Sequence, residues 1–251
     1  MRYLFIFFSL LCLFSLPSVS VLAEDKDDLI IDAALDQVDI TTGFDGAKLV
    51  VYGVKRVDGD LAIVVRGPDK YHTVRKKDQI MGVWMNVEAI EFKNVSSYYD
   101  YAVSANETKL AEVSLLQENK VGLNALSYEV ADDDEDPEEV RAFHESLIRL
   151  QQGSGLLPLE AQPVRYLDDG FFKVVFDLPA NVPIGLFQIE GFVFDDGDIV
   201  AKDTIDLNVG QVGLSANIYK FAHTQPWMYA IVILLIASAS GLFAHYAMRK
   251  G

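Results

Sequence analysis

The sequence predicts a mainly β protein: an exported antiparallel β-sandwich of the immunoglobulin type, in one or two subdomains, with a helical insertion and one C-terminal transmembrane helix. Short segments in which apolar and polar residues alternate recur along the chain, with Gly and Pro between them. A helical pattern interrupts these segments at residues 110–160. Two long apolar runs, residues 4–16 and 228–244, lie near the ends of the 251 residues.

The first apolar run has the organisation of a secretory signal. It follows Arg2 and precedes residues 21–23, whose side chains suit a signal peptidase site. Residues 1–23 are therefore predicted to be a signal peptide. An uncleaved N-terminal anchor is the alternative, but the run is shorter than the roughly 20 residues that a bilayer span requires.

Residues 24–109 are predicted to form a first β-sandwich domain. Its expected strands are residues 48–54, 60–66, 71–76, 82–87 and 98–103. Asp58-Gly59 separates the first two of these strands. Because this dipeptide suits a tight turn with positive φ, it predicts a β-hairpin there.

Residues 110–160 are predicted to be a helical, acidic connecting region. The acidic run 132–136 leads into Pro137, and Asp136 is the expected N-cap of a helix over residues 137–152. The run lacks the ligand spacing of a calcium loop, so we interpret it as a solvated lead into the helix. Side chains expected on the buried face of this helix are Val140, Phe143, Leu147 and Leu150, with Gly153 as its C-cap.

Residues 161–211 are predicted to be a second β region. Its expected strands are residues 162–166, 171–178, 185–194 and 200–209, with the acidic loop 195–198 joining the last two as a hairpin. Two arrangements agree with this pattern. The strands either form a second small sandwich or complete the first sheet.

The C-terminal segments are predicted to attach the protein to a membrane. Residues 212–225 form a juxtamembrane helix, 226–248 a transmembrane helix and 249–251 a cytoplasmic tail. The expected membrane-anchoring side chains are those of Trp227, Tyr229 and Tyr246 at the two interfaces and those of Arg249 and Lys250 in the tail. Small residues four apart, Ala237 and Gly241, allow the approach of another helix.

The positive tail predicts the orientation, because Lys and Arg are retained on the cytoplasmic side. Residues 24–225 should then lie in the periplasm, with the C-terminus in the cytoplasm of a bacterial inner membrane. Cys12, the one cysteine, lies in the signal, so no disulfide can support the exported body. The net charge of −16 makes nucleic-acid binding improbable.

No catalytic, metal or cofactor motif is present in the sequence. The four histidines are scattered, and no nucleophile elbow or phosphate-binding loop occurs. His144 is expected on the surface of its helix. We therefore expect no enzyme activity, no cofactor and no metal site. An envelope hydrolase with a dispersed site is a less favoured alternative.

One segment departs from the acidic character of the body. Residues 66–77 contain Arg66, Lys70, Arg75, Lys76 and Lys77 against Asp69. This basic segment could bind an anion, contact an acidic partner or pair with carboxylates of the same chain. The candidate binding residues are Arg66, Arg75, Lys76, Trp84 and Asn86. Trp84 is either a core residue, the commoner case, or an exposed stacking residue.

Several sequence blocks resemble a family of transmembrane proteins from alphaproteobacteria. They are residues 40–46, 51–53, 60–68, 74–77, 82–86, 178–185 and 220–227, including Val-Val-Arg-Gly-Pro at 64–68 and Gly-Val-Trp-Met-Asn at 82–86. The sequence departs from the family pattern in its acidic run before Pro137 and at Ser96-Ser97. The resemblance implies no particular activity, but it implies an envelope role near permeases of the sulfite-exporter TauE/SafE type, beside which members are often encoded.

These observations favour a non-catalytic, membrane-anchored periplasmic accessory or interaction protein. Its expected partners are the membrane itself and a membrane protein such as a TauE/SafE-type anion permease. A periplasmic receptor for an anion or small ligand, using the basic segment, is the alternative.

Overall fold

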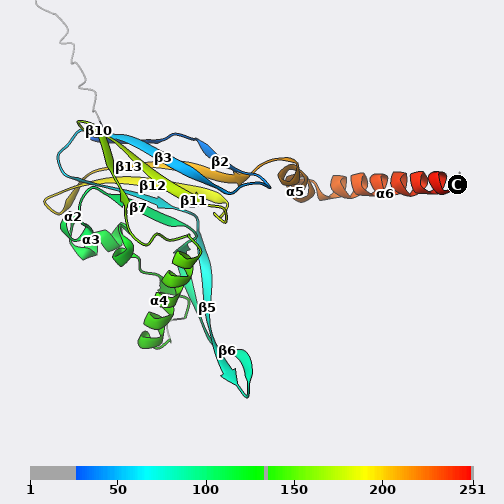
Figure 1. Ribbon diagram of the computed structural model, residues 1–251, viewed down its shortest axis with the longest axis horizontal. Coiled ribbons are helices and arrows are strands. Elements are labelled where there is room, and N and C mark those ends of the chain that lie inside the picture. Colours follow the sequence, from blue (N-terminus) through cyan, green and yellow to red (C-terminus); the bar gives the residue numbers. More distant parts are fainter. Residues whose placement is uncertain (1–26, 133–134, 250–251) are drawn as a thin grey trace, which may run out of the picture.

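The structure is a computed structural model that describes residues 27–132 and 135–249 (Figure 1). Two β-sheets form a head, a long hairpin projects from it, and a C-terminal helix leaves it in another direction. The mainly β fold with several antiparallel sheets is thus confirmed. The predicted signal peptide, Asp133, Asp134 and Lys250 lie outside the described residues.

The head consists of one antiparallel sheet and one mixed sheet. The first sheet has the order β1 (Leu29–Ala33), β3 (Gly46–Lys55), β11 (Phe171–Pro179) and β10 (Arg165–Asp168). The second has the order β2 (Gln37–Ile40), β13 (Asp198–Gln211), β12 (Gly185–Asp195), β4 (Asp60–Arg66), β7 (Tyr99–Val103) and β9 (Gln162–Pro163). Only β13 with β2 and β7 with β9 pair in parallel among these described strands.

The late strands complete the sheets that the early strands begin. β11 pairs with β3 from Phe171↔Val54 to Pro179↔Gly46. β12 lies between β4 and β13 in the second sheet. Of the two arrangements that the sequence left open, the strand pairing therefore selects the one in which residues 24–109 and 161–211 contribute to common sheets.

The hairpin predicted at Asp58-Gly59 is wrong. These residues connect β3 in the first sheet to β4 in the second, so the two strands do not pair. Gly59 does have a positive φ of 126°, and a Cβ there would lie 2.4 Å from the carbonyl oxygen of Phe194. The dipeptide marks a turn correctly, but turn chemistry alone does not decide which strands meet. The hairpin predicted at residues 195–198 is confirmed, with φ of 49° at Asp196 and 92° at Gly197.

Both faces of the second sheet are buried along β4, β7 and the C-terminal half of β12. Its inner face packs on the first sheet, where the core includes Leu49, Val51, Ile63, Phe172, Phe176, Phe187 and Ile189. Its outer face is covered by α2 (Glu107–Leu110), α3 (Val113–Glu118) and the 3-10 helix η1 (Leu123–Ala125). The side chains buried there include Val64, Tyr99, Tyr101, Leu110, Leu116, Phe192 and Phe194. This double cover explains the unbroken apolar run at residues 61–65.

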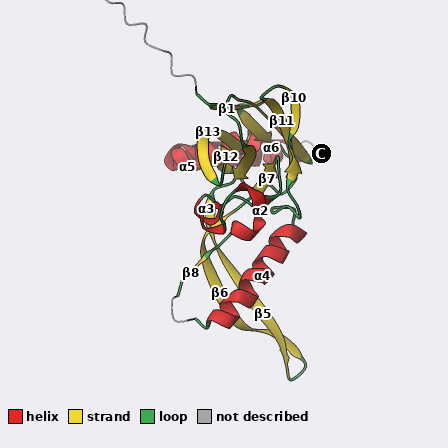
Figure 2. Cartoon of the chain, turned by 90° about the vertical axis from the view of Figure 1, so that its left-hand side faces the viewer, coloured by secondary structure: helices red, strands yellow, loops and turns green. Residues whose placement is uncertain are grey.

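A third sheet forms the projecting hairpin. β5 (Asp69–Ile80) pairs with β6 (Val83–Ser96), and β6 pairs briefly with β8 (Glu129–Val130). Both long strands exceed the predicted ranges of 71–76 and 82–87. The helix α4 (Pro137–Gly153) packs on the base of this sheet, as Figure 2 shows. Val74, Ile90, Phe92, Val95, Phe143 and Leu147 form the small core there. We call residues 75–88 the arm.

The start of α4 is as predicted, whereas its end differs. The Asp136 side chain accepts a hydrogen bond from the Glu138 amide at 3.1 Å, and Pro137 is the first helical residue. Gly153 is the last helical residue and not the cap. The residue in the left-handed conformation is Gly155, with φ of 74°. The Gly155 amide donates to the Gln152 carbonyl oxygen, and the Leu156 amide donates to the Gln151 carbonyl oxygen. Leu150, predicted as core, is 63% exposed.

The chain ends in two helices, α5 (Leu214–Thr224) and α6 (Pro226–Met248). α6 has the predicted bounds, whereas α5 begins two residues later and ends one residue earlier than the predicted 212–225. In the described part of the chain, α6 is the one helix long and apolar enough to cross a membrane, over Pro226–Tyr246. Figure 1 shows that the arm points across the axis of α6.

Replacing Gly53 with Ala should destabilise the head. A Cβ at Gly53 would lie 2.3 Å from the Phe172 ring and 2.6 Å from the Ile30 carbonyl oxygen, so β3 and the Phe172 ring would have to move apart. We expect a loss of about 1–3 kcal/mol, measured by thermal or urea denaturation followed by circular dichroism. Gly43→Ala is the matched control, because nothing lies within 4 Å of its Cβ position. Equal effects of the two substitutions would contradict this packing.

Candidate functional site

The end of the arm carries a cluster of exposed apolar side chains. We define the arm tip as residues 80–85. Its apolar side chains are exposed as follows: Ile80 46%, Met81 100%, Val83 61%, Trp84 69% and Met85 50%. Met81 and Gly82 form the turn, with φ of 52° and 83°. The tip is therefore a solvent-exposed apolar knob on a paired two-stranded stem.

The structure decides between the two alternatives for Trp84. Its side chain is 69% exposed, so it is not the core residue that is the commoner case, because beyond Val74 and Ile90 no described layer covers the arm. Asn86 is also exposed. Trp84 points from one face of the ribbon, while Val83 and Met85 belong to the other, so the tip is apolar on both faces. Exposed apolar clusters of this kind mark interaction sites.

The predicted basic residues fall into two separate places. Arg66 lies on β4 in the head, where its guanidinium forms an ion pair with the buried carboxylate of Glu190 on β12. Lys202 Nζ on β13 lies 2.8 Å from the other oxygen of Glu190. Burial lowers the pKa of Arg66, and burial and the charge of Arg66 lower the pKa of Lys202. Arg66 thus pairs with a carboxylate of its own chain, which is one of the three alternatives for this segment.

Arg75 and Lys76 instead lie at the base of the arm. Lys76 Nζ is 2.9 Å from Glu88 Oε2 across the ribbon, and this hydrogen bond and charge raise the pKa of Lys76. Both residues line a groove of about 430 Å³ between β5 and α4, which we call the α4–β5 groove. Its floor contains Val74, Ala142 and Phe143, and Leu150 lies at its edge. The polar side chains of its rim are Arg75, Lys76, Glu88, Glu139, Ser146 and Arg149.

Sequence reasoning missed the contribution of α4 to this groove. Arg149 lies some 70 residues after Lys76 in sequence, and no local pattern links them. The available signal was Leu150, whose position in the apolar stripe of α4 implied a partner surface. In the structure that stripe extends past the small core, and Leu150 lies at the edge of the groove.

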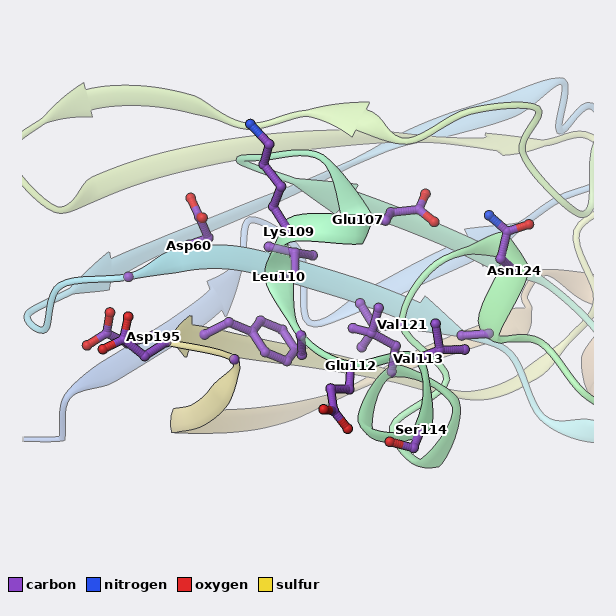
Figure 3. A pocket seen from close by; sticks show the side chains of 17 residues that line it. Asp60, Glu107, Lys109, Leu110, Glu112, Val113, Ser114, Val121, Asn124 and Asp195 are labelled. Carbon is purple, nitrogen blue, oxygen red and sulfur yellow. The ribbon is translucent and has the colours of Figure 1, made fainter.

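A larger cavity of about 1100 Å³ lies between α2, α3 and the β12–β13 turn (Figure 3). Its lining includes the carboxylates Asp60, Glu107, Glu112, Asp195 and Asp196, together with Lys109 and the apolar side chains Leu110, Leu116, Val121 and Phe194. Two of the carboxylates have internal partners: Asp60 accepts from the Ser104 hydroxyl and Glu107 from the Tyr101 hydroxyl. The negative rim attracts cations. Among the described residues, no group of three or more His, Cys, Asp or Glu is placed to hold a metal ion.

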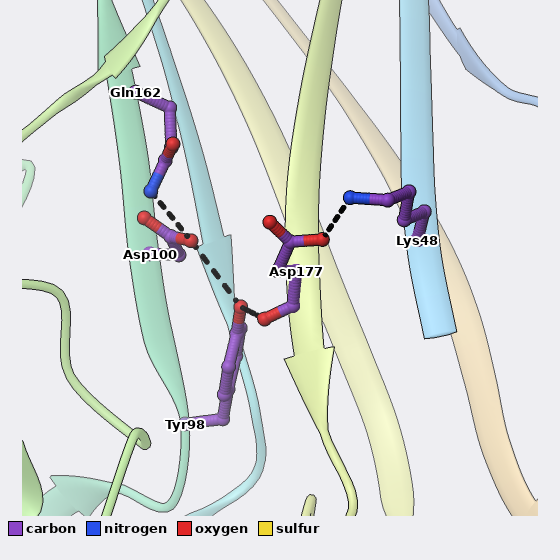
Figure 4. A network of polar contacts seen from close by, with 5 residues as sticks. All are labelled: Lys48, Tyr98, Asp100, Gln162 and Asp177. Carbon is purple, nitrogen blue, oxygen red and sulfur yellow. Dashed lines mark hydrogen bonds and ion pairs between the residues drawn. The ribbon is translucent and has the colours of Figure 1, made fainter. Parts of the chain in front are cut away.

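A buried polar network connects the two sheets of the head (Figure 4). Asp100 on β7 accepts from the Tyr101 amide at 2.8 Å and from Gln162 Nε2 at 3.5 Å. The Tyr98 hydroxyl lies 3.4 Å from Asp100 Oδ2 and 3.3 Å from the Asp177 carbonyl oxygen of β11. Burial raises the pKa of Asp100 to about 6, although these hydrogen bonds oppose the shift.

The hydrogen-bond geometry explains why the protonated form of Asp100 is favoured. The Tyr98 hydroxyl has one hydrogen and two acceptors within reach. When Asp100 is protonated, it can donate to the Tyr98 oxygen, which leaves Tyr98 free to donate to the Asp177 carbonyl. The grooves described above do not include Asp100. The network therefore ties the sheets together rather than facing a ligand.

His144 also differs from expectation. Its ring lies 5.3 Å from the Tyr128 ring and 6.2 Å from the Phe92 ring, measured between centroids. It is half-buried rather than on the surface, and desolvation lowers its pKa. It therefore belongs to the packing between α4 and the hairpin.

Among the described residues, the β-sandwich head is followed by one candidate membrane span, which is the layout of a membrane-anchored protein. A family model described as "Putative transmembrane protein (Alph_Pro_TM)" matches residues 28–250, and the chain belongs to this family. The family resemblance of the sequence blocks is confirmed to that extent. No curated protein matches the chain.

Asp100→Asn should stabilise the protein at high pH. The raised pKa means that folded Asp100 holds its proton more tightly than the unfolded chain does, so its contribution is present at low pH and is lost as the pH rises through about 6. Asn can still accept from the Tyr101 amide and can donate to the Tyr98 oxygen, without the buried charge, and we expect a gain of about 2 kcal/mol at pH 8 that vanishes near pH 4. Denaturation from pH 4 to 8 measures it.

The control for this substitution is Tyr98→Phe combined with Asp100→Asn. Without the Tyr98 hydroxyl, the amide introduced by Asp100→Asn has no tyrosine oxygen to donate to. The stability that Asp100→Asn adds at pH 8 should therefore be smaller in the Tyr98→Phe background than in the parent. A stability difference between Asp100→Asn and the parent that does not change with pH would contradict the assignment.

Proposed function

We propose that this protein is a non-catalytic, membrane-anchored envelope protein that works by binding other proteins. The observation that carries the proposal is the arm tip, where five large apolar side chains stay in solvent at the end of a ribbon. Soluble surfaces rarely keep such a cluster without a binding role. The arm holds it away from the head, as a docking element requires (Figure 1).

The proposed location is the bacterial inner membrane, with the head in the periplasm. The support comes from the sequence on both sides of the head. Residues 1–23 have the pattern of an export signal, and Arg249 and Lys250 follow the span as a cytoplasmic tail would.

The proposed partner class is a membrane protein, with a TauE/SafE-type permease as the specific candidate. The family resemblance supports it through the genes that often lie beside those of family members. The span supports it as well: Ala237 and Gly241 lie one helical turn apart, and nothing lies within 4 Å of a Cβ built at Gly241. Such a face allows close packing with another helix.

Replacing Met81 and Trp84 with Ser should disrupt binding without unfolding the head. The two side chains are 100% and 69% exposed, so their removal costs little packing. We expect co-purification with the co-expressed permease, after mild detergent extraction, to fall by about tenfold, the equivalent of about 1.4 kcal/mol.

Leu159→Ser, at an exposed position of the head, is the matched control and should leave co-purification unchanged. If the parent protein elutes alone at every salt and detergent condition, the proposal of a stable partner is wrong.

A second candidate function is a receptor for a small anion with an apolar part. The α4–β5 groove favours it, because Arg75, Lys76 and Arg149 surround an apolar floor. The volume of about 430 Å³ falls in the range of small-ligand sites. Arg66 is no longer part of this hypothesis, since it pairs with Glu190 in the head.

The receptor hypothesis predicts anion-dependent stability. Saturating alkyl sulfonate or carboxylate should raise the melting temperature of the parent, because a ligand that binds only the folded state stabilises it. Replacing Arg75, Lys76 and Arg149 with Gln should abolish the shift. The control Arg165→Gln, on β10, should keep it. If no anion raises the melting temperature of the parent, the receptor hypothesis fails.

A further inference from the structure

The arm lacks the support that ribbons of its kind normally need. Its backbone pairs continue out to Ile80↔Val83, but β8 reaches β6 only at Phe92 and Lys93. Residues 75–88 are thus a two-stranded ribbon. Isolated two-stranded hairpins are marginally stable in water, and a third strand or a covering surface normally stabilises them. The arm therefore gains stability from any surface that covers it.

A surface with matching properties lies at the base of the same arm. The floor of the α4–β5 groove is apolar, and Leu150 remains 63% exposed at its edge. One arm thus offers an apolar knob at its tip and an apolar groove at its base. Both surfaces expose apolar side chains to solvent, and contact between them would remove this apolar surface from water.

The tip cannot reach the groove of its own molecule. The ladder between β5 and β6 is continuous apart from shifts near Lys70 and Lys76, so the arm does not fold back on itself. Figures 1 and 2 both show the tip pointing away from α4. A contact between tip and groove must therefore involve two molecules.

The direction of the arm suits a neighbour in the same membrane. The arm points across the axis of α6, so a bilayer crossed by α6 runs alongside the arm. A two-fold axis along the membrane normal then places two arms at one height and antiparallel. In that arrangement each tip meets the base of the other arm.

We propose that two copies of this chain pair by exchanging arms, with the tip of each arm in the α4–β5 groove of the other. This inference rests on the proposed role of the arm as a docking element. The interface is isologous: residue i of one copy contacts residue j of its partner, and j contacts i. Trp84 and Met81 are the anchors, and the exposed side chains of Ala142 and Leu150 on α4 are the surface that receives them.

The charges along the arm agree with antiparallel packing. Arg75, Lys76 and Lys77 lie toward the base, and Asp78 lies next to the tip. Parallel arms would place like charges together. Antiparallel arms bring Asp78 of each copy toward Arg75 and Arg149 on the rim of the partner groove, where Glu88 is already paired with Lys76 and Glu139 is the other carboxylate.

Anchoring reduces the affinity that this contact must provide. Two heads held on one membrane surface meet at a high effective concentration. An interface smaller than the standard size of about 1,600 Å² therefore suffices to pair them.

Cysteine cross-linking of the full chain tests the proposal, with Cys12 first changed to Ser. Copies carrying Met81→Cys and one tag are reconstituted in vesicles with copies carrying Leu150→Cys and a second tag. Oxidation should join the two tags at least about tenfold more than in the control, in which Leu159→Cys replaces Leu150→Cys. All three positions are well exposed, so folding should be retained.

A charge exchange provides a second, independent measurement. Asp78→Arg alone and Arg149→Asp alone should each lower cross-linking by about tenfold, and the double variant should restore it. Restoration would support the pairing of these two sites. Failure of either single variant to reduce cross-linking, or of the double variant to restore it, would contradict the antiparallel arrangement.

Other outcomes separate this inference from the proposed function. If cross-linking stays at the control level while Met81→Ser and Trp84→Ser still abolish permease co-purification, the arm binds the permease and the dimer is wrong. If neither measurement responds, both proposals fail. If brominated lipid quenches Trp84 fluorescence in a Trp227→Phe background, the tip lies in the bilayer and the dimer is again wrong.

Discussion

The second sheet of the head has to be covered on both of its faces, because β4 and β12 carry apolar side chains on each. The first sheet covers one face, and α2, α3 and η1 cover the other. The rest of the head follows from this requirement. The segment that contains α2, α3 and η1 lies against the outer face, and the late strands β11 and β12 must return to opposite sheets of the same sandwich.

Polar groups in such a sheet are tolerated where partners are available. Glu190 is buried within β12, yet cations from both neighbouring strands, Arg66 and Lys202, meet it. Asp100 lies near the edge of the sheet, where the Tyr98 hydroxyl and the Gln162 amide surround it. Neighbouring cations favour the charged form of a carboxylate. Asp100 has only neutral donors, and burial raises its pKa. One sheet thus holds two buried acids in different electrostatic environments.

The head, the arm and the span have different physical roles in the molecule. The head buries most of the apolar surface and provides a stable base. The span fixes the molecule to a membrane through an apolar helix whose side chains face outward from the protein. The arm carries apolar side chains that neither the head nor the span covers. Binding is therefore favoured at the arm, where association can still remove apolar surface from water.

Local sequence determined what depends on local chemistry. The turn at residues 195–198, the cap at Asp136, the apolar span and the strand at residues 60–66 were all predicted, because each depends on neighbouring residues. Tertiary structure decided which strands pair, and so it placed β3 and β4 in different sheets despite Asp58-Gly59. It also separated Arg66 from Arg75, joined Arg75 with Arg149, and left Trp84 in solvent. Alternation shows that a strand has an apolar face, but only the packing of distant segments determines whether anything covers that face.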